Sequence, residues 1–296
     1  MSIWDGDPTT VFGNRNRFLK ARSHPLGWAV RVTPGIPIAA TLIYGSRYAV
    51  LVDTFMTVHQ AKGLADWVEQ SGKKLKTIYI THGHGDHWFG AGTLLQRFPA
   101  AEVVASPGTV KMMGSKASPE VLCDAWERAF PGQIPSDRVV ANVLEYDVID
   151  LEGEELRVVD LGHTDTDRTS CLHVASLGLV VAGNAAYNDV HLYLAESNTR
   201  KRQKWLAALD KIEALEPHAV VASHKRPGKE DTPCIIEETR QYIRDFDRLV
   251  ASTTTAQELY DKMLELHPTR LNPELALWSC ASAMKSSTES SILPAR

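Results

Sequence analysis

Residues 79–90 read YITHGHGDHWFG and carry the strongest chemical signal in the chain. Four metal-ligating side chains, His82, His84, Asp86 and His87, fall within six residues, directly after the apolar, strand-like run LKTIYI. Alternate residues of an extended segment face the same way, so His82 and His84 can reach one ion, while a turn through Gly85 directs the other two to a second. A solvated histidine-rich loop is the weaker alternative. The run predicts a metal centre that suits one or two zinc ions, with manganese or iron as alternatives.

Strand-like and helical patterns alternate on both sides of this loop. Residues 28–55 contain three β-rich runs separated by turn signals, and residues 58–70 have a helical pattern. A second β series occupies residues 148–184, a helical pattern covers 199–215, and HAVVASH is a last strand that ends at His224. Strands in two series, each followed by helices, predict an α/β fold in which two sheets pack face to face with helices outside, a four-layer αββα sandwich.

The 296 residues are enough for one large core, and no linker or low-complexity segment divides them. We therefore expect a single domain over residues 1–296, with a core at about 28–228 and a helical C-terminal extension at about 233–296. Two helical stretches of the extension, ELYDKMLELH and PELALWSCASAMK, are suited to form a lid over the site or a contact in a homodimer.

Charge and hydropathy narrow the range of partners. The net charge of −4 includes no lysine or arginine run, so there is no electrostatic basis for binding nucleic acid. The first residues lack the pattern of a secretion signal, and no stretch approaches the roughly 18 apolar residues of a membrane span. We expect a cytoplasmic protein that acts on a small molecule, without nucleic acid or membrane as a partner.

The spacing of His82, His84, Asp86 and His87 resembles the HxHxDH signature of the metallo-β-lactamase superfamily, and the resemblance extends over roughly residues 28–228. It implies the αββα fold and a set of further ligands in a fixed order along the chain. These are a histidine at the end of a later strand, then an acidic residue, then a last histidine.

His163 follows the strand-like run RVVDLG, and His224 follows HAVVAS, so they match the two further histidines. The resemblance implies that His82, His84 and His163 hold a first ion, and that Asp86, His87 and His224 hold a second.

The acidic position of the pattern differs, because Asn184 stands where the family has aspartate. An asparagine oxygen is neutral and a weaker partner for a dication, so we expect the second ion to bind less tightly. Asp189, five residues further on, is a less favoured substitute because it lies in YNDVHLYL, a run with a helical pattern.

A dication at this site would lower the pKa of bound water from 15.7 to about 7 and polarise a carbonyl group. The predicted reaction is the opening of a small lactone or lactam, including bicyclic aromatic ones such as benzoxazolinone, by attack of a metal-bound hydroxide. Asp86 would orient or deprotonate the water. Tyr187 has the spacing at which lactonases of the superfamily carry a tyrosine, and its phenol would donate to the developing oxyanion. A packing role for Tyr187 is an equal alternative.

Four further residues have weaker signals. Asp53 ends the run YAVLVD, where superfamily members often carry an acid that orients a ligating histidine; a helix-capping aspartate is the alternative. Trp88, His191 and Tyr193 are candidates for the substrate pocket, although core filling is the safer interpretation of Trp88.

Two other functions remain open. One is an iron-dependent oxidoreductase, because sulfur dioxygenases of the superfamily have similar histidine loops. The other is a binding protein that turns its substrate over poorly because Asn184 replaces the bridging aspartate.

Overall fold

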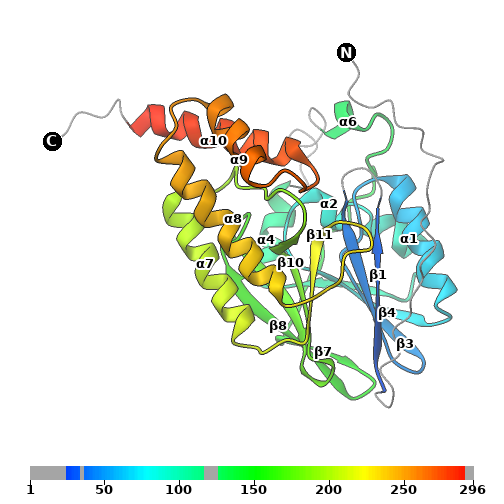
Figure 1. Ribbon diagram of the computed structural model, residues 1–296. Coiled ribbons are helices and arrows are strands. Elements are labelled where there is room, and N and C mark those ends of the chain that lie inside the picture. The colour runs from blue at the N-terminus through cyan, green and yellow to red at the C-terminus, as the bar shows by residue number, and fades with distance from the viewer. Residues whose placement is uncertain (1–24, 34–36, 117–125, 291–296) are drawn as a thin grey trace.

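Two β-sheets lie face to face in the computed structural model, which describes residues 25–33, 37–116 and 126–290 (Figure 1). In this part of the chain the sheets have the strand orders β1-β2-β3-β4-β5-β6 and β11-β10-β9-β8-β7. The strands are β1 (Gly27–Val32), β2 (Ala39–Tyr44), β3 (Tyr48–Val52), β4 (Lys74–Ile80), β5 (Glu102–Ala105), β6 (Asn142–Val143), β7 (Val148–Leu151), β8 (Glu154–Gly162), β9 (Thr169–Val174), β10 (Leu179–Asn188) and β11 (Ala219–Lys225). Pairing is antiparallel from β1 to β3 and from β7 to β10, and parallel elsewhere.

Helices cover the outer face of each sheet, with α1 on one side and α7 and α8 on the other (Figure 1). The helices are α1 (Val58–Gln70), α2 (Gly85–Trp88), α3 (Ala91–Arg97), α4 (Pro107–Lys116), α6 (Trp126–Ala129), α7 (Thr199–Glu213), α8 (Cys234–Val250), α9 (Ala256–Leu266) and α10 (Pro273–Ser290), with a 3-10 turn at Ala175–Leu177. Polar side chains cap the N-termini of several helices. Thr57 and Gln60 form a capping box at α1, and Asn198 caps α7.

Successive side chains of β3 enter two different cores. Ala49 and Leu51 belong to the apolar cluster beneath α1 and α3, whereas Val50 and Val52 belong to the cluster between the sheets. The strand β10 alternates in the same way between the inter-sheet cluster and the cluster under α7 and α8. Strands buried on both faces require this pattern, and it confirms the predicted four-layer sandwich.

One edge of the sandwich collects the ends of strands from both sheets. The parallel pairs β3–β4 and β10–β11 both end there. The two sheets are also tied together at this edge, where Ser170 donates its backbone N–H to the carbonyl oxygen of Thr81 and Ile38 forms a β-bridge with His224. Loops that follow these strands are therefore held close together.

The sequence prediction was wrong for YNDVHLYL, which is not helical. Tyr187 and Asn188 end β10, and the residues that follow form a loop up to α7. Asp189 pairs with Arg226 there and does not replace Asn184 at the site. Hydrogen bonds to α10 hold the rest of the loop, since the Ser279 hydroxyl donates to Leu192 and accepts from the backbone N–H of Leu194.

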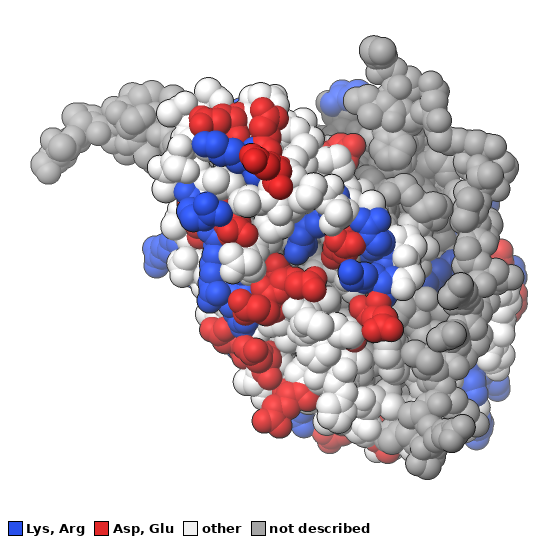
Figure 2. All heavy atoms as spheres, viewed as in Figure 1, with Lys and Arg blue, Asp and Glu red and all other residues white. Residues whose placement is uncertain are grey.

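The described residues show no large patch of one charge on the face in Figure 2, as the small net charge of the sequence leads one to expect. On the face shown in Figure 2, acidic and basic side chains of the described residues are interspersed. Three large apolar side chains on the C-terminal helices, Leu266, Leu277 and Trp278, are exposed. Among the described helices, none combines the length and apolarity needed to cross a membrane.

Candidate metal centre

Trp88 anchors the histidine loop that follows β4 to the apolar core. Trp88 is fully buried in the cluster under α1 and α3, and its indole N–H donates to the Gly83 carbonyl at 3.2 Å. A Cβ at Gly85 would lie 2.3 Å from the ring of Phe89, so the tight path of the loop requires glycine. Trp88 therefore packs in the core, as the alternative interpretation of this residue expected.

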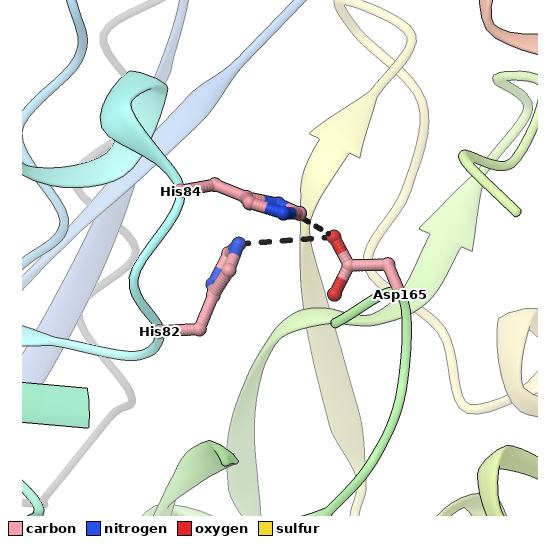
Figure 3. A group of neighbouring side chains, drawn as sticks. All are labelled: His82, His84 and Asp165. Carbon is pink, nitrogen blue, oxygen red and sulfur yellow. Dashed lines mark ion pairs between the residues drawn. The ribbon is translucent and has the colours of Figure 1, made fainter. Parts of the chain in front are cut away.

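The first group of ligating side chains consists of His82, His84 and Asp165 (Figure 3). Oδ2 of Asp165 lies 3.1 Å from Nδ1 of His84 and 3.8 Å from Nε2 of His82. The two histidines come from the loop after β4, and the aspartate comes from the loop between β8 and β9.

The second group consists of Asp86, His87 and His224. Oδ2 of Asp86 lies 3.4 Å from Nε2 of His87 and 3.5 Å from Nε2 of His224. The groups adjoin, because the ring centroids of His82 and His87 are 4.1 Å apart.

Three of the histidines have their other ring nitrogen engaged outside the groups. Nδ1 of His82 is 3.0 Å from the Thr81 hydroxyl, and Nε2 of His84 is 3.1 Å from the Glu196 carboxylate. Nδ1 of His87 is 2.9 Å from Oδ2 of Asp53. Such contacts fix the tautomer and the orientation of a metal-ligating imidazole.

Asp53 joins the elements around the centre. Besides His87, it accepts hydrogen bonds from the backbone N–H of Thr81 at 2.9 Å and from the Ser223 hydroxyl at 3.1 Å. It is fully buried and has a φ of 61°, a left-handed backbone conformation that is uncommon outside glycine but that aspartate adopts more readily than most residues. Asp53 therefore contacts His87 directly, which is the contact that the predicted orienting role requires.

Carboxylates dominate the electrostatics of the centre. Burial opposes protonation of His84, but Asp165 and Glu196 outweigh it and raise its pKa to about 9. Burial also opposes protonation of His87, but Asp86 and Asp53 raise its pKa to about 10. Both carboxylates that face the groups, Asp86 and Asp165, have pKa values well below their usual range, because neighbouring histidines outweigh the effect of burial.

The donor set fits a divalent metal. Within the described chain, Nε2 of His87 and Oδ1 of Asn184 lie beside the two groups and are buried without a hydrogen-bond partner, which is costly unless another group satisfies them. Each group combines two imidazoles with one carboxylate, a set used by both zinc and non-haem iron.

His163 is not brought into the first group, contrary to the sequence prediction. Its Nε2 lies 2.9 Å from the Ser197 hydroxyl and its Nδ1 lies 2.8 Å from Oδ1 of Asp167. Both ring nitrogens are thus occupied, and Asp165, two residues further on, takes the position beside His82 and His84.

Asn184 lies against the first group, but it turns its amide nitrogen toward the group and not its oxygen. Its side-chain N–H₂ donates to Oδ2 of Asp165 at 2.8 Å and lies 3.2 Å from Nε2 of His82. The amide therefore contacts both partners through its nitrogen, while its oxygen has no partner among the described residues.

The predicted pocket residues fall in different places. Tyr187 stacks on His224, and its buried hydroxyl meets no hydrogen-bond partner of good geometry among the described residues. The Tyr193 ring contacts the His84 ring edge-on, with the two ring centroids 5.7 Å apart. His191 instead shares a hydrogen bond with the Tyr242 hydroxyl on α8 and is not part of either metal-ligating group.

Asp165 and Glu196 are the site residues that the sequence analysis missed. The sequence did contain a clue to Asp165, because Asp165 lies two residues after His163, the same spacing as between His82 and His84. Glu196 had none, since it lies 112 residues from its partner His84 and is brought there by the loop after β10.

Curated relatives match only parts of the chain. The uncharacterized protein YobT of Bacillus subtilis (strain 168) is 35% identical over 80 residues, which is 27% of this chain and 34% of that protein. A hydroxyacylglutathione hydrolase of Francisella philomiragia subsp. philomiragia is 38% identical over 64 residues, 22% of this chain and 24% of that protein. The matches thus span about a third or less of these relatives.

Solved structures match the fold over most of the chain. A metallo-beta-lactamase family protein from Thermus thermophilus has a TM-score of 0.64 at 22% identity and covers 91% of this chain and 95% of its own. A beta-lactamase domain protein from Burkholderia ambifaria has a TM-score of 0.63 at 16% identity, over 91% and 87%. The sequence profile described as metallo-beta-lactamase superfamily matches residues 33–224, more than half of the chain. With its HxHxDH loop at the shared edge of two sheets, the chain belongs to the metallo-β-lactamase superfamily.

Proposed function

We propose that this chain is a metal-dependent hydrolase that opens a small lactone or lactam. The observation that carries the proposal is the pair of adjoining His/Asp groups, with the phenol of Tyr187 stacked beside the second group, where its hydroxyl meets no well-aligned partner among the described residues. Hydrolases of this kind need a cation site, an activated water and a donor for the developing oxyanion.

Six side chains would hold the metal: His82, His84, Asp165, Asp86, His87 and His224. When bound, a divalent ion supplies Lewis acidity and lowers the pKa of water. Asp86 is the carboxylate suited to orient an incoming water, because its side chain keeps some exposure to solvent whereas that of Asp165 is fully buried. Asp53 and Glu196 would keep their histidine partners in the ligating orientation.

Tyr187 is suited to donate to the substrate oxyanion. Burial raises the pKa of this phenol well above its ordinary value, so it keeps its proton at neutral pH. Because this hydroxyl donates to no well-aligned acceptor among the described residues, it can donate to a substrate oxygen without first breaking another such hydrogen bond. Tyr193, which contacts the edge of His84, would border the same space.

A thioester is the second substrate class that an observation favours. The local similarity to a protein named hydroxyacylglutathione hydrolase covers only 64 residues, but the same site chemistry would attack a thioester carbonyl. An iron-dependent oxidoreductase is the other candidate, because two histidines with one carboxylate form a donor set found in non-haem iron enzymes.

The test combines metal analysis with a substrate panel. The protein would be loaded separately with zinc, manganese and iron, and then assayed on lactones, lactams including benzoxazolinone, and thioesters. We expect metal-dependent lactone or lactam hydrolysis that chelator abolishes. Thioester hydrolysis alone would shift the substrate class, and oxygen consumption by the iron form would favour the oxidoreductase.

A protein that binds these compounds without turning them over would have a different signature. Calorimetry would then show binding, the panel would show no turnover, and Asn184→Asp would produce a large gain in rate.

A further inference from the structure

Asp165 projects from the loop between β8 and β9 to His82 and His84 (Figure 3). It is fully buried, and both of its oxygens are held: Oδ1 accepts from the Thr164 hydroxyl at 3.1 Å, and Oδ2 accepts from the side chain of Asn184 at 2.8 Å. A buried carboxylate is costly unless charged or polar partners satisfy it. Its position is therefore fixed by specific contacts on two sides.

Asn184 contributes the contact that aims this carboxylate. The preceding Gly183 has a φ of 59°, and a Cβ there would lie 2.9 Å from the Thr81 hydroxyl, so the end of β10 passes close to the histidine loop. From this position the Asn184 amide donates to Asp165. An aspartate at 184 could not donate that hydrogen bond, so the neutral amide and the carboxylate are matched to each other.

The charge of the first group comes from Asp165. Two neutral imidazoles alone would leave a dication with no negative ligand in this group, and residue 184 supplies none. Asp165 restores one negative charge, so that each group has two histidines and one aspartate.

His163 is engaged elsewhere. Its two ring nitrogens contact Ser197 and Asp167, and Asp167 in turn pairs with Lys201 at 3.1 Å. These contacts hold the loop after β8 against the start of α7 and leave His163 without a free nitrogen.

We propose that Asp165 is a metal ligand of the first group and that Asn184 is its positioning residue, the carboxylate being supplied by the β8–β9 loop and not by β10. This inference rests on the proposed function, because it takes a resident metal for granted. The role of His163 is then to support the loop that presents Asp165.

Zinc stoichiometry separates these roles. The parent chain, Asp165→Asn and the matched control His163→Gln would be saturated with zinc, freed of excess metal by gel filtration, and analysed for zinc per chain. Circular dichroism would confirm that each variant is folded. We expect Asp165→Asn to retain one zinc ion fewer than the parent, and His163→Gln to retain the parent content.

Two further measurements extend the test. The visible spectrum of the cobalt-loaded protein reports the donor set directly, and we expect it to change in Asp165→Asn and to be preserved in His163→Gln. The double variant Asp165→Asn/Asn184→Asp moves the carboxylate to β10, and we expect it to recover the ion that Asp165→Asn loses.

The outcomes distinguish the inference from the function on which it rests. Loss of an ion from His163→Gln, or full zinc content in Asp165→Asn, would overturn the assignment of Asp165 while leaving a metal-dependent enzyme in place. Absence of metal from the zinc-saturated parent would overturn the proposed function as well.

Discussion

The phenol ring of Tyr187 lies parallel to the imidazole of His224, with ring centroids 5.3 Å apart and ring planes 12° apart. The two residues are direct neighbours in the parallel pairing of β10 and β11, so strand register sets the stack. The sequence spacing that suggested Tyr187 as a substrate ligand therefore coincides with a backbone position that holds its hydroxyl beside the second metal-ligating group.

Removing the Tyr187 hydroxyl should lower activity far more than stability. Tyr187→Phe deletes a buried hydroxyl that meets no well-aligned partner, so we expect the melting temperature to change little. Loss of an oxyanion donor should lower kcat by about 10²–10³-fold. Steady-state kinetics and thermal melts, with the exposed Tyr146→Phe as control, would check this. Unchanged kcat would show that Tyr187 only packs.

Asp53 should be required for both folding and metal binding. Asp53→Ala leaves the contacts of His87, Thr81 and Ser223 unsatisfied, and we expect a loss of about 3–5 kcal/mol in unfolding free energy. Asp53→Asn keeps the shape but removes the charge behind His87, and we expect zinc affinity to fall by about 10–100-fold.

Urea unfolding and competition with a chromophoric chelator would measure the two effects of replacing Asp53. The surface variant Asp66→Asn serves as the control for loss of one acidic charge. Zinc affinity equal to the parent in Asp53→Asn would contradict an orienting role.

Regular patterns predicted the fold and the histidine loop well. The strands alternate between two cores, and the HxHxDH residues all lie in one short segment, the loop after β4 and the short helix α2, so short-range sequence spacing was enough to find them. The choice between His163 and Asp165 was different. It depends on the turn after β8, where Gly162 has a φ of 78°, and periodicity does not report which side of such a turn faces the sheet edge.

The loop after β10 was mispredicted because distant contacts set its conformation. Apolar spacing favoured a helix, but His191 donates its backbone N–H to Leu271, and Leu194 donates to Ser279 on α10. These partners are far away in sequence, and they deliver Glu196 to His84. Tertiary contacts thus overrode a local preference.

Asn184→Asp should destabilise the metal-free protein. The new carboxylate would stand where the amide now donates to Asp165 at 2.8 Å, so two like charges would share a buried site. We expect a lower melting temperature than the parent in chelator at pH 7, and a larger rise on zinc addition, because the ion relieves this repulsion. Lower pH should reduce the deficit as one carboxyl group takes up a proton.

Differential scanning fluorimetry with and without zinc would measure the effect of Asn184→Asp, with the exposed Asn142→Asp as control. Equal melting temperatures of parent and Asn184→Asp in chelator would mean that residues 184 and 165 do not contact each other in the metal-free protein.

Glu152 should give the fold a stability that depends on pH, away from the metal centre. Its carboxylate accepts from the Ser46 hydroxyl and from the backbone N–H groups of Ser46, Arg47 and Tyr48, and these bonds lower its pKa from 4.5 to about 2. A pKa depressed in the folded state stabilises above the unfolded value, and that contribution disappears as pH falls through the folded value.

The parent should therefore be more stable than Glu152→Gln at pH 7, and the difference should shrink between about pH 5 and pH 2. Urea unfolding in chelator across this range measures the difference, and chelator keeps metal loss at low pH from contributing. The exposed Glu145→Gln should track the parent throughout. If the difference in unfolding free energy between the parent and Glu152→Gln stayed constant with pH, the contacts of residue 152 with the turn before β3 would not depend on the negative charge of Glu152.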